Sequence, residues 1–434
     1  MEYIAEKSCL ASKPELDLFE NPPTSASVQD SIYIEHLPTS SLDDNSPIKF
    51  SVSGDSQYYT DLNASYLYLE VKVCKADGSN LDADTAVGPI NLLGHTLFQQ
   101  VDVLLEDVLV SNASNLYHYR AIMEHLLGYS NETKTSQLTS TLYSKDTAGS
   151  MDDKDNANAG LVARRSYIEQ SKTLPLICRL HQDMFLQKRF LINGVGIKLK
   201  LTRNADKFLL MAADGSDFKL KITHAAFFVR KVTINKGIVL QHIQKMEKQL
   251  LPALYPIRKV EMKTYHIATG SLAWNEEGLF SGILPRRIVI GLVDGAAFDG
   301  AYHRNPFNFK HHNLKYCSLL IDGKMRPQTP LDSNFENNLS LRNYFTLFEA
   351  TGKVFQDAGI DVNRREYEQG YSLVAWDLTT ELEDTGCYHI IKKGDIRLEL
   401  KFSRALTTPV NVVVYSEFDS CIKIDKDRKV LPPY

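Results

Sequence analysis

A strand, a tight polar turn, a second strand and a short helix follow one another twice in this chain, about half its length apart. The first copy lies in GHTLFQQVDVLLEDVLVSNASNLYHYRAIMEHLLGY, residues 94–129, and the second begins with HNLKYCSLLIDGKMRPQTP, residues 312–330. The turns are Glu-Asp at 106–107 and Asp-Gly at 322–323. Asp-Gly favours a two-residue β-hairpin because glycine adopts positive φ without a steric penalty. A chain that repeats this unit is constrained to build one arrangement of strands and helix twice.

Each hairpin is followed by the start and stop signals of a helix. The spacing of apolar residues predicts one helix from Ser114 to Gly128 and another from Ser340 to Gly352. A serine hydroxyl can accept a free amide at the first turn, and glycine can adopt the left-handed conformation that ends a helix. The repeated unit therefore includes an aromatic-rich helix.

Two further echoes follow in the same order. IKLKLTR at 197–203 is matched in polarity by LELKFSR at 398–404, and ITHAAFFVRKVTI at 222–234 more loosely by VVVYSEFDSCIKI at 412–424. The separation between equivalent points falls from 216 residues at the turns to 201 and then 190. A constant order with shrinking separations is expected of two copies of one fold that differ in loop length.

The strands themselves are recognised by a period of two. In YLYLEVKV, residues 66–73, leucine and valine alternate with tyrosine, glutamate and lysine, and FKLKIT (218–223) and DIRLELKFS (395–403) alternate in the same way. Such strands bury one face and expose the other, as in antiparallel sheets. The chain has 434 residues, more than one hydrophobic core usually serves. We therefore predict a mainly β protein with two tandem β-sandwiches and a few short helices.

The composition of successive segments divides the chain. Residues 1–45 are rich in proline, serine and aspartate and are predicted to form an N-terminal arm. The first sandwich is assigned to 46–236, a linker helix and junction to 237–258, and the second sandwich to 259–434. The linker reads as a helix that is interrupted at Pro252.

The arm contains a small apolar motif, Leu16, Leu18 and Phe19, among acidic residues. It is either part of a disordered tail or a segment that docks on a neighbouring subunit. These three residues are the candidate assembly contacts. A second segment, 131–160, is polar and exceeds the usual length of a loop, and we expect it to be exposed.

Charge and targeting signals exclude several classes of protein. The formal net charge is −4, from 49 basic and 53 acidic residues, which does not indicate a dedicated nucleic-acid binder. The N-terminus has no secretory signal, and no apolar run approaches the roughly 20 residues of a membrane-spanning segment. We expect a protein made inside the cell and not secreted, whose six scattered cysteines are reduced.

No catalytic motif is present. GxSxG, HExxH and GxxxxGK[ST] do not occur. The aspartates within 152–155 lack the glycine and glutamate of a calcium loop, and the histidines at 311–312 would point to opposite faces of a strand. The arginine pairs at 164–165 and 364–365 are predicted to form surface ion pairs. We predict no catalytic, metal-binding or cofactor-binding residues, no cofactor, and no enzymatic activity.

Five blocks spread over nearly the whole chain carry a more specific resemblance. GPINLLGHTLFQQVDVLLEDVLVSNASNLYHYRAIMEHLL (88–127) resembles the corresponding block of the major capsid (hexon) proteins of Polinton or Maverick elements and the related adintoviruses. The other blocks are ELDLFENPPTSASV (15–28), LPALYPIRKVEMKTYHI (251–267), YHRNPFNFKHHNLKYCSLLIDGKMRP (302–327) and RREYEQGYSLVAWDLT (364–379).

The resemblance implies a double jelly roll, two eight-stranded antiparallel sandwiches side by side. It also implies a homotrimer of pseudo-hexagonal outline that tiles an icosahedral shell. The expected partners are neighbouring capsomers and the penton and other minor capsid proteins. Double-stranded DNA would be enclosed without sequence-specific binding, and the protein would be located in the virion capsid. With the arm at the base of the trimer, deletion of residues 1–30 is expected to spare trimers and impair shells.

Three alternative functions would require different sequence features. A minor capsid (penton) protein with a single jelly roll would lack the second half of the chain. A non-viral two-domain β-sandwich carbohydrate-binding protein would expose tryptophan platforms, and only Trp274 and Trp376 are available. A secreted glycan-cleaving amidase with tandem jelly rolls would need an export signal and clustered carboxylates.

Overall fold

The computed structural model describes most of the chain and is mainly β, with 39% of residues in strands and 20% in helices. The predicted fold class is confirmed. The described residues are 7–8, 11–19, 21–42, 46–213, 215, 217–357, 359–380 and 387–432.

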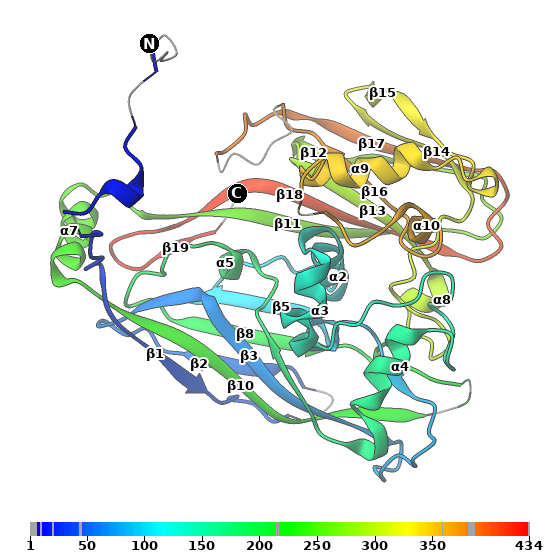
Figure 1. Ribbon diagram of the computed structural model, residues 1–434, viewed down its shortest axis with the longest axis horizontal. Helices are drawn as coiled ribbons and strands as arrows, with labels where there is room; N and C mark the ends of the chain where they lie inside the picture. Colours follow the sequence, from blue (N-terminus) through cyan, green and yellow to red (C-terminus); the bar gives the residue numbers. More distant parts are fainter. Residues whose placement is uncertain are drawn as a thin grey trace.

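The first half of the chain forms two four-stranded antiparallel sheets (Figure 1). Sheet 1 has the order β1-β10-β3-β7, and sheet 2 has the order β2-β8-β5-β6. The strands are β1 (Val28–His36), β2 (Ile48–Val52), β3 (Tyr59–Lys75), β5 (Phe98–Leu105), β6 (Val108–Leu109), β7 (Leu174–Cys178), β8 (Ile197–Arg203) and β10 (Phe218–Ile234). A separate two-stranded ladder joins β4 (Gly88–Pro89) to β9 (Leu210–Met211).

The second half also forms two sheets. Sheet 3 has the order β11-β18-β13-β16, with the short β19 (Val430–Leu431) paired to β18, and sheet 4 has the order β12-β17-β14-β15. The strands are β11 (Ala253–Ile267), β12 (Ala273–Ile283), β13 (Arg287–Asp294), β14 (Leu314–Ile321), β15 (Lys324–Asp332), β16 (Leu373–Asp377), β17 (Lys393–Phe402) and β18 (Val410–Ile424).

The two halves have one topology. Leaving out the β4–β9 ladder and β19, each half has eight strands, and in both halves the order is first-eighth-third-sixth in one sheet and second-seventh-fourth-fifth in the other. This is the double-sheet arrangement of a jelly roll. All four sequence echoes fall on equivalent elements, since β8 corresponds to β17, β10 to β18, and the two predicted turns join the fourth strand to the fifth.

The predicted hairpins are confirmed. Residues 106–107 have φ of 44° and 65°, and residues 322–323 have φ of 48° and 77°. Two successive positive φ angles define the type I′ turn, whose twist matches that of the flanking strands. Both turns have the expected length of two residues, since β6 starts at Val108 and β15 at Lys324.

The helices are short and lie mainly in the connections between strands. Within the described residues, none combines the length and the apolar character that a membrane span requires. They are α1 (Leu93–Thr96), α2 (Tyr117–Gly128), α3 (Asn131–Thr135), α4 (Ala159–Ser166), α5 (Asp183–Leu186), α6 (Asp206–Leu209), α7 (Lys236–Lys248), α8 (Gly295–Phe298), α9 (Leu341–Thr351) and α10 (Arg364–Tyr367). The predicted repeat helices are α2 and α9, which both follow the fifth strand of their half.

Sheet 3 lies in the middle of the molecule, between sheet 4 and the helices α2 and α5 of the first half (Figure 1). Successive residues of β18 therefore enter different cores. Val412 and Val414 belong to the core of the second sandwich, whereas Val413 and Tyr415 pack into the core of the first half. One hydrophobic core thus extends from the first sandwich across the junction.

Two predicted boundaries need correction. The arm does not extend to residue 45, because β1 pairs with β10 from Val28 onward and closes the edge of sheet 1. The side chains of β1 are mostly exposed, so the sequence of β1 lacks the alternation that marks the other strands. The second sandwich begins at Ala253 rather than at residue 259, where β11 pairs with the end of β18. The linker helix is α7, and it ends at Lys248.

The cysteines are distributed over both sandwiches. Within the described part of the chain, the five cysteines are free, and four of them are buried. They are Cys74, Cys178, Cys317, Cys387 and Cys421. Cys9 lies outside the described residues.

Candidate functional site

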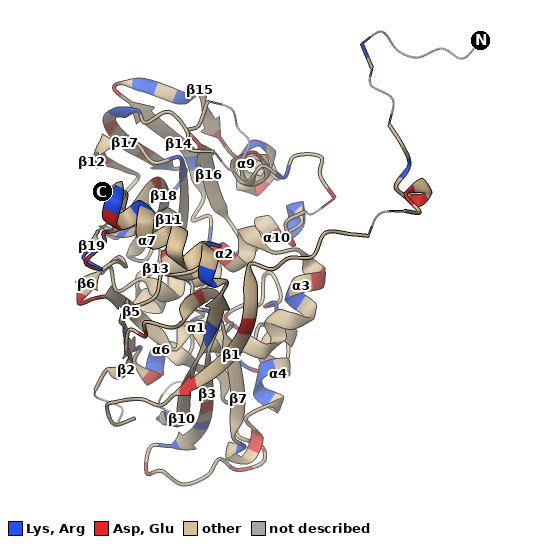
Figure 2. Ribbon diagram, turned by 90° about the vertical axis from the view of Figure 1, so that its left-hand side faces the viewer, with Lys and Arg blue, Asp and Glu red and all other residues tan. Residues whose placement is uncertain are grey.

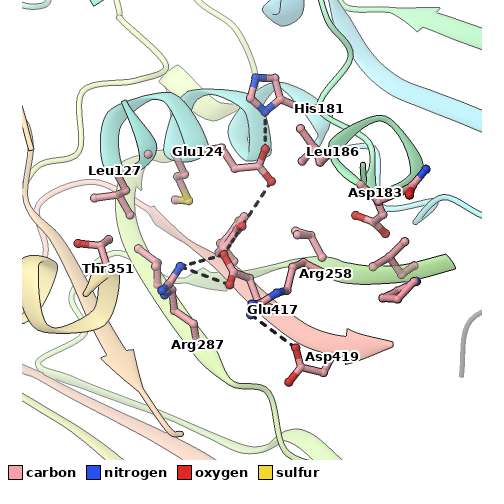
Figure 3. A pocket seen from close by; sticks show the side chains of 18 of the residues that line it. Glu124, Leu127, His181, Asp183, Leu186, Arg258, Arg287, Thr351, Glu417 and Asp419 are labelled. Carbon is pink, nitrogen blue, oxygen red and sulfur yellow. Dashed lines mark hydrogen bonds and ion pairs between the residues drawn. The ribbon is translucent and has the colours of Figure 1, made fainter. Parts of the chain in front are cut away.

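A cavity of about 550 Å³ lies where the two sandwiches meet (Figure 3). The first half contributes α2 and the segment around α5, and the second half contributes β11, β13, β18 and the end of α9. Ionisable side chains from both halves lie on its wall. They are Glu124, His181, Asp183, Arg258, Arg287, Lys353, Glu417 and Asp419.

On the side of the first half, Arg120 lies between two acids. Its guanidinium donates to Glu124 at 2.9 Å and to Asp183 at 2.7 Å, and all three residues lie deep in the protein. Burial alone would raise the pKa of Glu124, but Arg120 and His181 outweigh it and hold that pKa at about 2. Burial raises the pKa of Asp183, and the ion pair with Arg120 opposes this rise.

On the side of the second half, two acids of β18 are paired with arginines. Arg287 lies 3.2 Å from Glu417, and Arg258 lies 3.5 Å from Asp419. The hydroxyl of Tyr415 joins the two sides, because it donates to Glu417 at 2.8 Å and also lies 3.4 Å from Glu124 in α2 (Figure 3).

The ion pairs at this cavity lie within the separate halves. Arg120 pairs with two acids of the first half, and Glu417 and Asp419 are each paired with an arginine of the second half. The hydroxyl of Tyr415 and the carboxylate of Glu124 make a contact across the junction. Buried ion pairs are expensive to break, so these pairs hold each wall of the cavity in place.

The later part of the segment 131–160 strengthens the same junction. The prediction of an exposed segment agrees with most of residues 131–140 and was wrong for much of 141–160. Asp146 is buried and accepts hydrogen bonds from Arg164 and from Asn158 at 2.8 Å, as well as from Asn305 of the second half at 3.1 Å. Polar residues that satisfy one another are stable in an interior, so a polar sequence did not mean exposure. Arg164 was predicted to lie at the surface and is instead fully buried.

A second link runs from the same segment. The ammonium group of Lys145 lies 2.9 Å from Glu366 and 3.1 Å from Asp361, both in the second half. Asp152 of this segment accepts the backbone amide of Asn305 at 2.9 Å and pairs with Lys310 at 3.0 Å. The two halves are therefore connected by polar contacts of residues 145–152 as well as by those at the cavity.

Three buried histidines lie beside the cavity and escaped the sequence analysis. His95, His125 and His181 come from separate segments, and one ring nitrogen from each lies within 4.8 Å of the others. Their sequence spacing fits no known ligand motif, so only the fold could have brought them together. Among the described residues, this group is the arrangement best suited to hold a metal ion.

The predicted assembly residues lie elsewhere. Leu16, Leu18 and Phe19 are 68%, 75% and 96% exposed. They belong to the N-terminal segment, which projects from the body of the molecule (Figure 2). The three residues are near neighbours in sequence, and none of them lines the cavity.

The outer face of sheet 1 carries a group of aromatic side chains that no other part of the described chain covers. Phe228 stacks on Tyr66 with ring centres 5.1 Å apart, and Tyr33 lies 5.7 Å from Tyr66. Tyr68 adds an edge-on contact to Phe228 at 6.5 Å. Tyr33 is 51% exposed. We call these four residues the sheet 1 patch.

Comparisons with known proteins bear on the fold. No family model matches the chain. The Caenorhabditis elegans protein "Uncharacterized protein F54H12.2" is 25% identical over 395 residues, which cover 87% of this chain and 91% of that protein. A chain in the cryo-EM structure of the Sputnik virophage is 11% identical, with a TM-score of 0.62 over 98% of this chain and 92% of that chain.

Two structures of named capsid proteins are also similar. The Faustovirus major capsid protein has a TM-score of 0.60 at 9% identity and covers 94% of this chain and 92% of its own. The mavirus major capsid protein has a TM-score of 0.55 at 10% identity and covers 99% and 96%. The fold is a double jelly roll. The likeness spans both sandwiches and the junction between them.

Proposed function

We propose that this chain is a viral major capsid protein. Three copies would form a pseudo-hexameric trimer, and the trimers would tile an icosahedral shell around double-stranded DNA. The observation that carries the proposal is that two sandwiches of one topology pack head to tail within one chain. The similarity to the Faustovirus and mavirus major capsid proteins supports the same role. In this role the protein is located in the virion and has no enzymatic activity.

The contact between the two sandwiches suggests how the trimer closes. Within the chain, the outer face of sheet 3 receives the α2 side of the first half. The helix α9 of the second half is the equivalent of α2 in the first half. Sheet 1 of the first half is the equivalent of sheet 3 in the second half. A repeat of the internal contact between chains would place the α9 side of one subunit on sheet 1 of the next. A head-to-tail contact forms a ring when its rotation closes, here after six sandwiches and three chains.

Both surfaces of this contact carry exposed apolar residues. The sheet 1 patch is one of the two surfaces. On the other, Leu341 and Phe345 of α9 are 50% and 37% exposed. Exposed apolar groups on a surface are typical of protein–protein contacts.

Trimer formation can be measured by size-exclusion chromatography with light scattering. We expect a particle near 147 kDa, three times the chain mass of 49.0 kDa. Tyr33→Asp and Phe345→Asp should each give folded monomers, because each places a charge in the proposed contact. Ser51→Asp, on the exposed side of sheet 2, is the matched control and should remain trimeric. A wild-type protein that is monomeric at all concentrations would refute the proposal.

If only one of the two variants dissociated the trimer, trimer formation would stand and the pairing of α9 with sheet 1 would be wrong. A circular dichroism spectrum of each variant separates dissociation from unfolding.

The arm is proposed to connect capsomers. Leu16, Leu18 and Phe19 would insert into neighbouring capsomers or into penton and other minor capsid proteins. A deletion of residues 1–20 tests this better than one of 1–30, because it leaves β1 intact. We expect normal trimers and few closed shells by electron microscopy. Shells of normal number and size from the truncated protein would contradict the assignment.

We also propose that the protein belongs to the Polinton or adintovirus group. The blocks at 88–127 and 302–327 support this assignment. A similar protein in a nematode is expected if copies of such elements are integrated in animal genomes. Genes for a packaging ATPase, a maturation protease and a protein-primed polymerase beside this gene would test it.

The carbohydrate-binding alternative finds less support. Trp376 is buried, and Trp274 is half-buried with its ring 5.8 Å from Tyr265. Neither tryptophan forms an exposed platform of the kind that stacks on sugar rings.

A further inference from the structure

Three histidines of the first half meet in its interior. His95 lies in α1, His125 in α2, and His181 in the segment that follows β7. They are 1%, 1% and 4% exposed. The centres of the three rings lie 4.5 to 5.3 Å from one another.

Two of the rings are oriented through Nδ1. Nδ1 of His125 lies 2.8 Å from the carbonyl oxygen of Ala121, and Nδ1 of His181 contacts the carboxylate of Glu124. A carbonyl and an ionised carboxylate only accept hydrogen bonds, so in the neutral form of either ring the proton is on Nδ1. Nε2 of each ring then has a free lone pair, and Nε2 of His125 is buried without a hydrogen-bond partner.

The third ring is held in the same manner. Nδ1 of His95 lies 3.0 Å from the hydroxyl of Tyr117, which also accepts the backbone amide of His181 at 3.0 Å. A hydroxyl oxygen can accept two hydrogen bonds, so Nδ1 of His95 can donate to it and leave Nε2 free. Histidines that bind metals are oriented in this way, with the second ring nitrogen donating to a carboxylate, a carbonyl or another oxygen.

Burial favours the neutral form of two of these rings. It holds the pKa of His95 and that of His125 well below the ordinary value of a histidine.

We propose that His95, His125 and His181 form a zinc site, with water as the fourth ligand. Three imidazoles and an open position suit Zn²⁺. Ligand nitrogens at about 2.0–2.1 Å from one tetrahedral ion are roughly 3.4 Å apart. The ring nitrogens here lie within 4.8 Å, so small rotations of the side chains bring them into range.

The position of the site assigns it a structural role. It joins α1, α2 and the segment after β7, which also contact one another through side-chain packing, hydrogen bonds and the ion pair between Arg120 and Asp183. Glu124 bonds to His181 and also lies 3.4 Å from the hydroxyl of Tyr415 in the second half. A metal at this position would therefore stiffen the wall of the junction between the sandwiches.

The test uses the full-length protein without a polyhistidine tag, stripped of metal with a chelator. Titration with ZnCl₂ by calorimetry should show one ion per chain. Bound Co²⁺ should give the strong visible absorption of tetrahedral coordination. Zn²⁺ should raise the melting temperature by on the order of 5 °C at saturating concentrations.

Variants locate the ion. His125→Gln and His181→Gln should weaken Zn²⁺ binding by about 100-fold or more, and Glu124→Gln by roughly 10-fold, since a lost orienting partner typically has an effect of 10–100-fold. His118→Gln is the matched control, because His118 is a buried histidine of the same helix outside the group, and it should bind as the wild type does.

The proposal fails if His125→Gln and His181→Gln bind Zn²⁺ as tightly as the wild type. It also fails if the wild type shows no bound ion, no thermal shift and no tetrahedral Co²⁺ spectrum. The second set of measurements decides the question even if the histidine variants do not fold.

Discussion

Sheets 1 and 3 have the same strand order, yet one has a bare face and the other is covered on both faces. In sheet 3, every residue of β18 from Val410 to Ser416 is buried. In sheet 1, the equivalent strand β10 alternates, and Thr223 and Lys221 are exposed. A sheet covered on both faces needs continuous apolar strands, whereas a half-covered sheet needs alternating ones. The same topology therefore occurs with two sequence patterns. A continuous apolar strand indicates that the chain covers both faces of the sheet, and an alternating strand indicates that it covers one.

The helices α2 and α9 differ in the same sense. Almost every residue of α2 is buried, whereas only Asn343, Thr346, Leu347 and Ala350 of α9 are. The first copy of the unit is enclosed by the junction, and the second presents an apolar side to solvent. The difference shows which surfaces of a repeated fold are left for a neighbouring molecule.

The largest effect on stability is expected from a charge placed on the face of sheet 3 that packs against the first half. Val413→Asp should lower the free energy of unfolding by about 4–5 kcal/mol or more, because the carboxylate would have no partner between the sandwiches. Thr223→Asp, on the face of sheet 1 that its own chain leaves uncovered, should change the stability of the single subunit by less than about 0.5 kcal/mol. Urea unfolding measures both. Equal effects would mean that the two faces are covered to the same extent.

A somewhat smaller loss is expected at the polar junction. Asp146→Ala should cost about 3–4 kcal/mol, since Arg164 would keep its buried charge without a carboxylate partner. Asp155→Ala, at an exposed position of the same segment, is the control. If the Asp146 variant unfolded in two steps where the wild type unfolds in one, the junction would be what couples the two sandwiches.

Acid should destabilise the first sandwich through His118. Burial lowers the pKa of His118 to about 3 in the folded protein. The unfolded chain, with a pKa near 6.5, binds a proton first. The stability is therefore complete above pH 6.5 and is lost as the pH falls toward 3, by about 3 kcal/mol between pH 7 and pH 4.

His118→Gln should flatten this part of the stability profile, measured by urea unfolding at several pH values. His312, with a pKa lowered by burial to about 4, provides the comparison in the second sandwich. If His312→Gln removed the whole pH dependence, the second sandwich would be the acid-sensitive half.

The smallest effect on stability is expected in the arm. Phe19→Ala should change the free energy of unfolding by less than about 0.5 kcal/mol, because the side chain is 96% exposed. The same variant should reduce shell formation. A clear loss of stability in the isolated trimer would mean that the arm folds back onto its own subunit.

Sequence patterns determined the fold well where a strand has one buried and one exposed face. The alternation in β3, β8 and β17 and the turns at 106–107 and 322–323 located equivalent strands in both halves. The pattern failed for β1, an edge strand with little burial, because nothing in its sequence distinguishes it from a polar loop.

The junction was harder to predict because its attachments depend on distant residues. Asp146 and Arg164 are polar in sequence and buried in the fold, and their partner Asn305 lies more than one hundred residues away. The three histidines posed the same difficulty, since no local spacing indicates that His95, His125 and His181 meet. The proposed contact between subunits could be suggested only by comparing the two folded halves.

The final strand of each sandwich occupies an interior position in its sheet. β10 lies between β1 and β3, and β18 lies between β11 and β13. During synthesis, neither sheet can be completed until its closing strand has emerged from the ribosome. The strand β1 is made some two hundred residues before its partner β10. Such long waits slow folding and expose unpaired edges. Each half of the nascent chain would therefore need chaperone protection until its last strand is inserted.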